Sequence, residues 1–296
     1  MRVADSQILG LLTGNLARTR GRILAAQEQV ATQKRVSRPS HDPVAYGQVV
    51  EGRSELSRTD QWARNIQFGT QRLQLADSTL TQTSSVLARI KELAVQARSD
   101  TVSAENRQAI AQEVRQLQRH LVQLANSEIN GQAIFGGTKT DVPPYVLGAG
   151  DTVTYQGNAE AQSIVVGEGL TIQVLIPGGQ VFSGPTANVF DGIRDLLAAM
   201  ELNNGAGIEA GIGSMDQALI QVTNAQGQVG GLVNRLETTA GWLDQANTLL
   251  SQTISENEDV DLAKAITELA RQQVSLEATQ ATLGRVFESS LLNFLR

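Results

Sequence analysis

The residues that could do chemistry are few in this sequence, and no pattern brings them together. The two histidines, His41 and His120, stand far apart in the chain, and no nucleophile motif accompanies either of them. We therefore interpret both as surface residues rather than as acid–base catalysts. The chain has no cysteine, which removes disulfides, thiol chemistry and thiolate metal sites.

The acidic run at residues 256–261 superficially suggests calcium. It lacks the glycine and the terminal bidentate glutamate of a calcium loop, and acids at the start of a new helix explain it better. The glycine pairs at 178–179 and 230–231 lack the strand–loop–helix context of a phosphate loop. We predict no catalytic residue, no metal and no cofactor, since an enzyme would need a convergent polar pocket that these residues do not build.

The charges divide unevenly along the chain. Residues 1–139 hold 18 Lys and Arg against 12 Asp and Glu, a net +6, whereas residues 140–296 hold 6 against 18, a net −12. Basic stretches with interleaved aromatics are absent, which argues against nucleic-acid binding. We expect instead that a basic N-terminal arm attracts an acidic C-terminal region and favours correct pairing. The basic residues are Arg18, Arg20, Arg22, Lys34, Arg35 and Arg38, and the acidic ones are Glu256, Glu258, Asp259 and Asp261.

Both ends of the chain carry a heptad pattern of apolar residues. The N-terminal columns are Leu9, Leu16, Ile23 and Val30, with Leu12, Thr19, Ala26 and Gln33 offset by three. The C-terminal columns are Leu262, Leu269, Leu276 and Leu283, interleaved with Ile266, Gln273, Gln280, Phe287 and Phe294. Each pattern is a narrow seam of the kind that coiled coils bury against a partner helix.

These seams predict assembly rather than catalysis. The glutamines in the C-terminal seam either face solvent or fix register at some cost in stability. The predicted assembly interface consists of Leu9, Leu12, Leu16, Ile23, Val30, Leu262, Ile266, Leu269, Gln273, Leu276, Gln280, Leu283, Phe287 and Phe294.

Between the two seams, the pattern predicts long helices, then a β-rich tip, then long helices antiparallel to the first ones. Pro39 and Pro43 break the first helix, and Ser40 or Asp42 can cap the next one. Helices are expected at 6–34, 44–98, 103–126, 188–200, 212–253 and from 260, strands at 153–155 and 171–176, and a flexible stretch at 203–207. At roughly 1.5 Å per residue the second helix could reach about 80 Å.

The predicted fold is mainly α: an elongated rod of long antiparallel helices with terminal coiled-coil segments and a small β-rich domain at the far end. The expected divisions are an N-terminal coiled-coil arm (1–38), a helical hairpin of the rod (39–139), the β-rich tip (140–185), return helices (186–259) and a C-terminal coiled-coil arm (260–296), with both arms ordered conditionally.

No apolar run approaches the roughly 20 residues that span a bilayer, so we expect no membrane insertion. Asp5, Gln7 and Gly10 interrupt any hydrophobic stretch near the start, so a signal peptide is not expected either. Composition alone suggests the cytoplasm, but it does not exclude export of an unfolded chain.

Several blocks of the sequence point together to one known family: Val30–Pro43, Arg53–Leu56, Glu92–Ala97, Ser103–Gln108, Ile134–Thr140, Asn188–Ile193 and Asp261–Ala263. In these blocks the chain resembles the flagellin superfamily, and within it the members that join hook to filament. The block Ile134–Thr140 is the most similar to the junction members, and the Pro39/Pro43 turn and the modest central domain also favour them over flagellin. His41 departs from the pattern, since the superfamily more often has an acidic residue there.

The resemblance implies a structural protein of the bacterial flagellum. Such a protein forms the junction ring between hook-associated proteins and the flagellin filament by pairing of its terminal helices, which are disordered in the monomer. The implied partners are further copies in the ring, the first hook-associated protein, flagellin, and an export chaperone with the type III export apparatus. The implied location is secreted and extracellular. Flagellin itself and a cytoplasmic coiled-coil scaffold are the alternatives, and the copy number and the contacts of residues 140–185 stay open.

Overall fold

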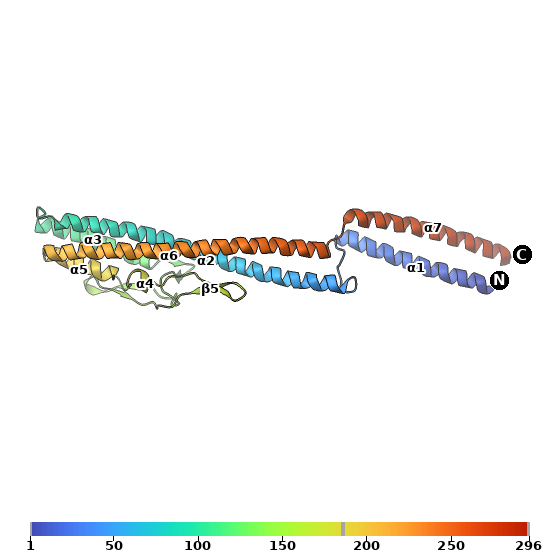
Figure 1. Ribbon diagram of the computed structural model, residues 1–296, viewed down its shortest axis with the longest axis horizontal. Helices are drawn as coiled ribbons and strands as arrows, with labels where there is room; N and C mark the ends of the chain where they lie inside the picture. The colour runs from blue at the N-terminus through green and yellow to red at the C-terminus, as the bar shows by residue number, and fades with distance from the viewer. Residues whose placement is uncertain (1, 185–186, 295–296) are drawn as a thin grey trace. The chain divides into compact units, whose positions relative to one another are not determined.

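The computed structural model of this protein describes residues 2–184 and 187–294, and it is mainly helical (Figure 1). This confirms the predicted fold class of long helices with a few small antiparallel strand pairs. The α-helices are α1 (Arg2–Thr32), α2 (Pro43–Arg98), α3 (Ala104–Ala125), α4 (Gly178–Val181), α5 (Val189–Glu201), α6 (Gly205–Glu258) and α7 (Leu262–Phe294). The strands are β1 (Glu128–Ile129), β2 (Gln132–Ala133), β3 (Tyr145–Leu147), β4 (Val153–Tyr155), β5 (Ser163–Gly167) and β6 (Leu170–Gln173), and a 3-10 turn, η1, covers Ala149–Asp151.

The chain forms two compact units. Unit 1 contains residues 1–58 and 246–296, and unit 2 contains residues 59–245. The helices α2 and α6 each contribute to both units, whereas α1 and α7 belong to unit 1 and all the strands belong to unit 2.

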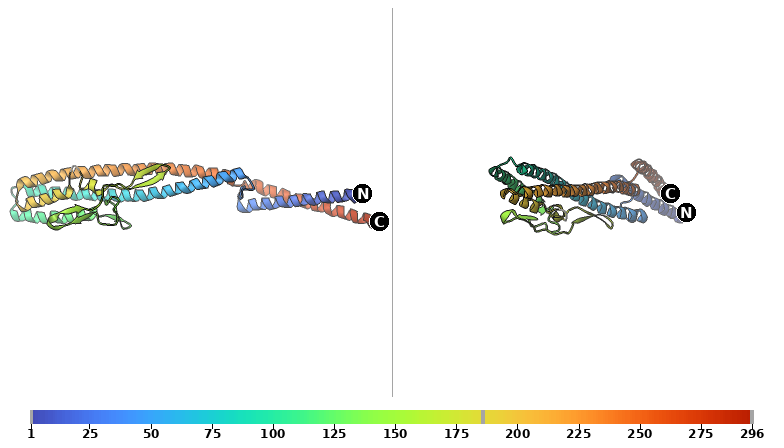
Figure 2. Two further views of the ribbon diagram at one scale, coloured as in Figure 1. Left: turned by 90° about the horizontal axis from the view of Figure 1, so that it is seen from below. Right: turned by 60° about the vertical axis from the view of Figure 1, so that its left-hand side comes forward.

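In unit 1, α1 and α7 lie side by side (Figures 1 and 2). As predicted, Asp42 caps α2, because its Oδ1 accepts hydrogen bonds from the amides of Val44 at 3.2 Å and Ala45 at 3.0 Å. Pro43 is the first residue of α2, where its missing N–H costs nothing. Asp261 caps α7 in the same way, through the Lys264 amide at 3.1 Å. Accepting these amide hydrogen bonds lowers the pKa of both carboxyls.

In unit 2, the helices enclose a continuous apolar core. The predicted N-cap of α3 is confirmed, since the Ser103 side chain accepts from the Asn106 amide. Leucines and a valine of α2 and α3 are completely buried, and α6 contributes a heptad column of its own. These core residues are Leu73, Leu80, Leu87, Val114, Leu121, Met215, Val222, Val229 and Leu236.

The start of α6 corrects the prediction of a flexible stretch at 203–207. The helix begins at Gly205, and the Asn204 side chain caps it by accepting from the Gly207 amide at 3.1 Å. A Cβ added at Gly207 would lie 2.8 Å from Ala199 Cβ, and one at Gly211 would lie 2.7 Å from Leu196 Cδ1. These glycines therefore allow α6 to pack closely on α5, which offsets their low helix propensity.

The strands of unit 2 form three separate antiparallel pairs: β1 with β2, β3 with β4, and β5 with β6. The strand expected at 171–176 is the shorter β6, and strand pairing starts at Glu128, before the expected tip region. Four aromatic rings meet between the strand pairs and the helices, with neighbouring centroids 5.1 to 5.8 Å apart. This aromatic cluster consists of Phe135, Tyr145, Phe182 and Phe190.

Candidate functional site

The α1 face that packs on α7 is the N-terminal seam. Ile23 and Ala26 are buried, and Leu12, Leu16 and Val30 are half-buried. The side chain of Leu9 lies outside the described residues. The seam columns read from the sequence therefore identify the side of α1 that meets a partner helix.

The α7 face that packs on α1 includes the predicted leucine column. Leu269 and Leu276 are half-buried and Leu283 is buried, while Leu262 is partly exposed. The second column against α1 is Ala265, Gln272 and Thr279. Small residues at two of these positions let the helices approach. The Gln272 side chain donates to Glu268 at 2.6 Å, which is the first cause of the lowered pKa of Glu268, and the charge of Arg22 on α1 lowers it further.

The other flank of the leucine column points away from α1. Ile266 is 54% exposed, and Gln273 and Gln280 are also exposed. The side chains of Phe287 and Phe294 lie outside the described residues. The predicted interface residues of α7 thus include some that pack within the protomer and some that stay uncovered.

Further apolar side chains are uncovered on the same helix pair. Leu11 and Leu24 of α1 are 65% and 66% exposed, and Val274 of α7 is 66% exposed. Single exposed apolar residues are ordinary on proteins. Leu11 and Leu24 lie on different sides of α1, because thirteen residues at about 3.6 per turn do not return to one face, so they add scattered apolar surface and not a second seam.

A polar clasp, formed by residues 33–36 and 257–260, ties the link after α1 to the link before α7. The Glu258 carbonyl accepts from the amides of Arg35 at 2.7 Å and Val36 at 3.3 Å, and the Val260 amide donates to the Gln33 carbonyl at 3.1 Å. Lys34 and Asp259 form an antiparallel β-bridge. The end of α1 and the start of α7 are therefore joined to the rest of unit 1 through segments that are hydrogen-bonded to each other.

The Glu258 carboxylate holds the charges of this clasp. It is 8% exposed, lies 2.6 Å from Lys34 Nζ, and accepts from Arg53 Nη2 at 2.5 and 2.7 Å. The expected attraction between the basic arm and the acidic region is realised at Lys34 and Glu258. Arg38 instead pairs with Glu28 at 2.9 Å. Arg53 lies outside the basic arm; the sequence marks it within the matching block Arg53–Leu56, but no pattern predicted its contact with Glu258.

The histidines lack the geometry of a catalytic base. His41 Nδ1 lies 3.4 Å from the Ser37 hydroxyl, but the acid nearby, Glu28, accepts from that hydroxyl and does not orient the imidazole. His120 is exposed on α3. In the acidic run, Glu256 accepts from Gln252, Glu258 belongs to the clasp, and Asp261 caps α7, so these carboxylates do not converge.

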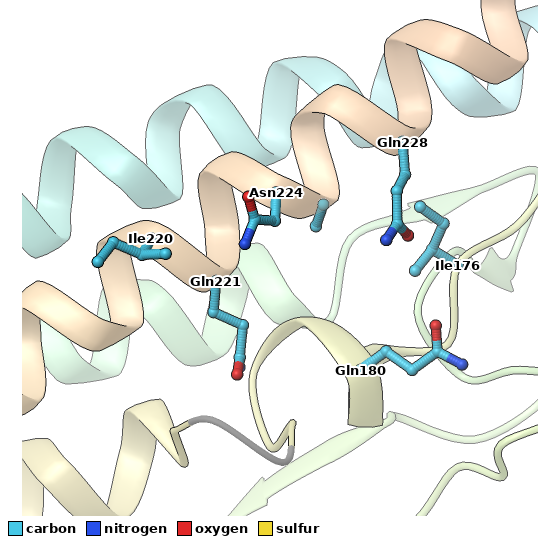
Figure 3. Close-up of a pocket in the computed structure, with 7 residues that line it drawn as sticks. Ile176, Gln180, Ile220, Gln221, Asn224 and Gln228 are labelled. Atoms are coloured by element: carbon cyan, nitrogen blue, oxygen red, sulfur yellow. The ribbon is translucent and has the colours of Figure 1, made fainter.

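One pocket of unit 2 gathers polar side chains, and these are amides. It has a volume of about 390 Å³ and is lined by Ile176, Gln180, Ile220, Gln221, Asn224, Ala225 and Gln228 (Figure 3). Gln221 donates to the carbonyls of Val181 and Ala187, so it fastens the segment after α4 to α6. Amides do not titrate near neutral pH, so this lining offers no acid or base.

Across residues 2–184 and 187–294, no group of histidine and acidic side chains could hold a metal ion. A search of the helices in the same ranges finds no stretch with the length and hydropathy of a membrane span.

Two family models match most of the helical chain. The model of the bacterial flagellin N-terminal helical region matches residues 11–140, and the model of the bacterial flagellin C-terminal helical region matches residues 212–295. Together these ranges contain α2, α3 and α7 and most of α1 and α6.

Two named flagellar proteins are similar to this chain over nearly its whole length. Flagellar hook-associated protein 3 of Salmonella typhimurium is 26% identical, with 100% of both chains covered. A flagellin of Halalkalibacterium halodurans is also 26% identical, covering 92% of this chain and 91% of its own. The solved structure of a putative flagellar hook-associated protein from Vibrio parahaemolyticus matches with a TM-score of 0.69 at 21% identity, over 74% of this chain and 100% of its own, which supports the fold.

Proposed function

Because this chain belongs to the bacterial flagellin family, we propose that it is a structural protein of the flagellum that joins the hook to the filament. It is a component that works by assembly and not an enzyme. The observation that carries the proposal is the α1–α7 pair, which holds both family-matched ends together and still leaves apolar residues uncovered on both helices.

The partners follow from that role. Copies of the chain form a ring through the terminal helices, with the first hook-associated protein on one side and flagellin on the other. The interface uses Leu12, Leu16, Ile23 and Val30 of α1 and the leucine column of α7 to shape the helix pair. The uncovered flank with Ile266, Gln273 and Gln280 then contacts a neighbouring copy.

The route to that place is export. The chain passes unfolded through the flagellar type III apparatus with an export chaperone, and it acts outside the cell. The absence of cysteine suits this route, since no disulfide can form before or during passage.

The test is deletion of the gene followed by complementation with the unaltered chain and with Leu276→Asp. A charge in the half-buried leucine column should abolish motility and junction formation, because it cannot be buried between helices. Circular dichroism and tryptophan fluorescence of the purified variant should show unit 2 folded. Normal motility of the Leu276→Asp strain would contradict the role of the terminal pair.

Flagellin is the second candidate, because the Halalkalibacterium flagellin matches at the same 26% identity as the hook-associated relative, although over less of both chains. The deletion strain separates the two functions. Loss of a junction protein leaves hooks without filaments while flagellin is secreted as monomer. Loss of a flagellin leaves hooks with the junction intact.

A further inference from the structure

Two asparagines of this chain directly precede a glycine, and the structure holds them differently. They are Asn130, before Gly131, and Asn204, before Gly205. Both asparagines are exposed, so contact with water does not distinguish them. An asparagine in this position can react with the backbone that follows it, because glycine has no side chain to keep its own nitrogen away from the asparagine carboxamide carbon. The local structure therefore determines which of the two reacts.

Asn130 and Gly131 are the turn residues of the β1–β2 hairpin. Their φ angles are 53° and 74°, the left-handed pair that a tight hairpin turn requires. Within the described residues, no hydrogen bond or ion pair involves the Asn130 carboxamide or the Gly131 amide. A Cβ added at Gly131 would have no atom within 4 Å, so the space around the turn is open. Both reacting groups are therefore free of other contacts.

Little structure opposes the rotation that the reaction needs at this turn. The Gly131 nitrogen approaches the carboxamide carbon when the peptide group between the two residues turns about the Asn130 Cα–C bond. The hairpin has two residue pairs, and a pair of strands this short has little stability of its own. Below it, the Ile134 amide donates to the Ser127 carbonyl at 3.0 Å, so the base of the hairpin stays tied while the turn opens. A local opening confined to an exposed turn needs little free energy.

Asn204, in contrast, is fixed at the start of α6. Its Oδ1 accepts from the Gly207 amide at 3.1 Å, and its carbonyl accepts from the Ile208 amide at 3.0 Å. Its own amide donates to the Ala199 carbonyl at 2.9 Å. Turning the peptide group before Gly205 towards the carboxamide would break the first hydrogen bonds of a 54-residue helix. The same pair of residues is therefore protected here by the fold.

We propose that Asn130 is a site of spontaneous deamidation and that Asn204 is not. The Gly131 nitrogen bonds to Asn130 Cγ, and Nδ2 leaves as ammonia with the proton of the Gly131 amide, which closes a cyclic succinimide. Water then opens the ring at either of its carbonyl carbons and leaves an aspartate or an isoaspartate, in which the backbone runs through the side-chain carbon. Either product exchanges a neutral amide for a carboxylate, so the net charge of the chain becomes more negative with time. The reaction needs only water and does not depend on the proposed function.

Two variants assign the change of charge to one residue. Asn130→Gly has no carboxamide and keeps a sequence that suits the turn, so isoelectric focusing should show that the aged variant lacks most of the acidic shift of the unaltered chain. Asn204→Ser keeps an oxygen that can cap α6 and should age like the unaltered chain. Circular dichroism before ageing checks that both variants are folded. An acidic shift of full size in Asn130→Gly, or its loss in Asn204→Ser, would overturn the proposal.

The rates of the two sites are compared in the unaltered full chain, kept at mildly alkaline pH for several weeks. Mass spectrometry of tryptic peptides measures both sites, electron-transfer fragmentation separates aspartate from isoaspartate, and a zero-time sample corrects for reaction during digestion. In the folded protein Asn130 should deamidate at least about tenfold faster than Asn204. In concentrated guanidinium chloride the two rates should agree within about threefold, because the residue pair is the same and the fold is lost. Folded rates within twofold of each other, or a tenfold difference that persists in the denaturant, would overturn the proposal.

Discussion

The terminal helix pair and unit 2 bury their apolar residues to different degrees. In unit 2, residues from α2, α3, α5 and α6 are buried on several sides and include a four-ring aromatic cluster. The described part of the α1–α7 pair has Ile23, Ala26, Ala265 and Leu283 as its buried apolar residues. Burial of apolar surface is the main favourable contribution to folding, so we expect unit 2 to be self-sufficient and the helix pair to need a further partner.

The difference indicates a division of roles within one chain: unit 2 provides most of the folding stability, and the α1–α7 pair provides the proposed assembly surface. A helix with one covered seam and an uncovered flank is stabilised further only when a second partner arrives. On the proposed function, the dense core of unit 2 would keep the remainder of the protein folded until that partner binds. The following predictions test this separation, starting with the largest expected effect.

Hydrogen exchange of the purified protein should show the widest contrast. Amides of residues 2–32 and 262–294 should exchange at least about 100-fold faster than the most protected amides of α2 and α6 in unit 2, because local opening of a thin helix pair needs less free energy. Mass spectrometry along the chain measures this. Equal protection of the ends and unit 2 would mean that the pair is already a complete bundle.

Phe190→Ala should destabilise unit 2 by about 3–5 kcal/mol, because it leaves a cavity in the aromatic cluster. Tryptophan fluorescence in urea reports on unit 2 alone, since Trp62 and Trp242 both belong to it. Ile23→Ala is the matched change in the terminal pair and should leave the fluorescence midpoint unchanged. A shift with Ile23→Ala would show that the two regions unfold together.

Glu258→Gln should destabilise the clasp by about 1–2 kcal/mol, because Lys34 and Arg53 lose a shared carboxylate but can still reach water. Faster exchange of the Arg35, Val36 and Val260 amides measures the loss. Glu256→Gln is the control, since that exposed carboxylate bonds Gln252 and lies outside the clasp. A similar acceleration in the control would show that total charge, and not the Glu258 contact, determines the effect.

Ile266→Ser should change the stability of the free protomer by no more than about 0.5 kcal/mol, because the side chain is mostly exposed. It should still reduce co-sedimentation with hooks, because it removes apolar surface from the uncovered flank. Leu269→Ser, in the covered column, should lower the helicity of the free protein. Loss of helicity with Ile266→Ser as well would place that flank inside the protomer's own pair.

Much of the fold could be read from local patterns. Prolines 39 and 43 and the Asp42 cap determine helix ends over short distances, and the structure has them as predicted. The heptad columns predicted the covered face of α1 but only one of the two columns of α7. The start of α6 could not be predicted in this way. The low helix propensity of glycine argues against a helix at Gly207 and Gly211, and their close packing on α5, which local sequence does not show, explains why α6 includes them.

Part of the candidate site could also be predicted from the sequence, where local periodicity was sufficient. The α1 seam is narrow, so its period identified its covered face. In α7 many alanines widen the apolar arc, and the period alone does not say which flank of the leucine column meets α1. The clasp could not be predicted, because Arg53 and Glu258 are brought together by the path of the whole chain.

The clasp also has a mechanical consequence. A helix joined to its protein by one linker can swivel about it, whereas α1 and α7 are joined by two linkers that are bonded to each other at Lys34 and Asp259. Torque applied to the helix pair is therefore divided between two chain segments and shears their cross-links instead of turning a single bond. In a component of a rotating flagellum, the clasp would resist twisting of the helix pair because two bonded chain segments share the load, so a large buried interface is not required.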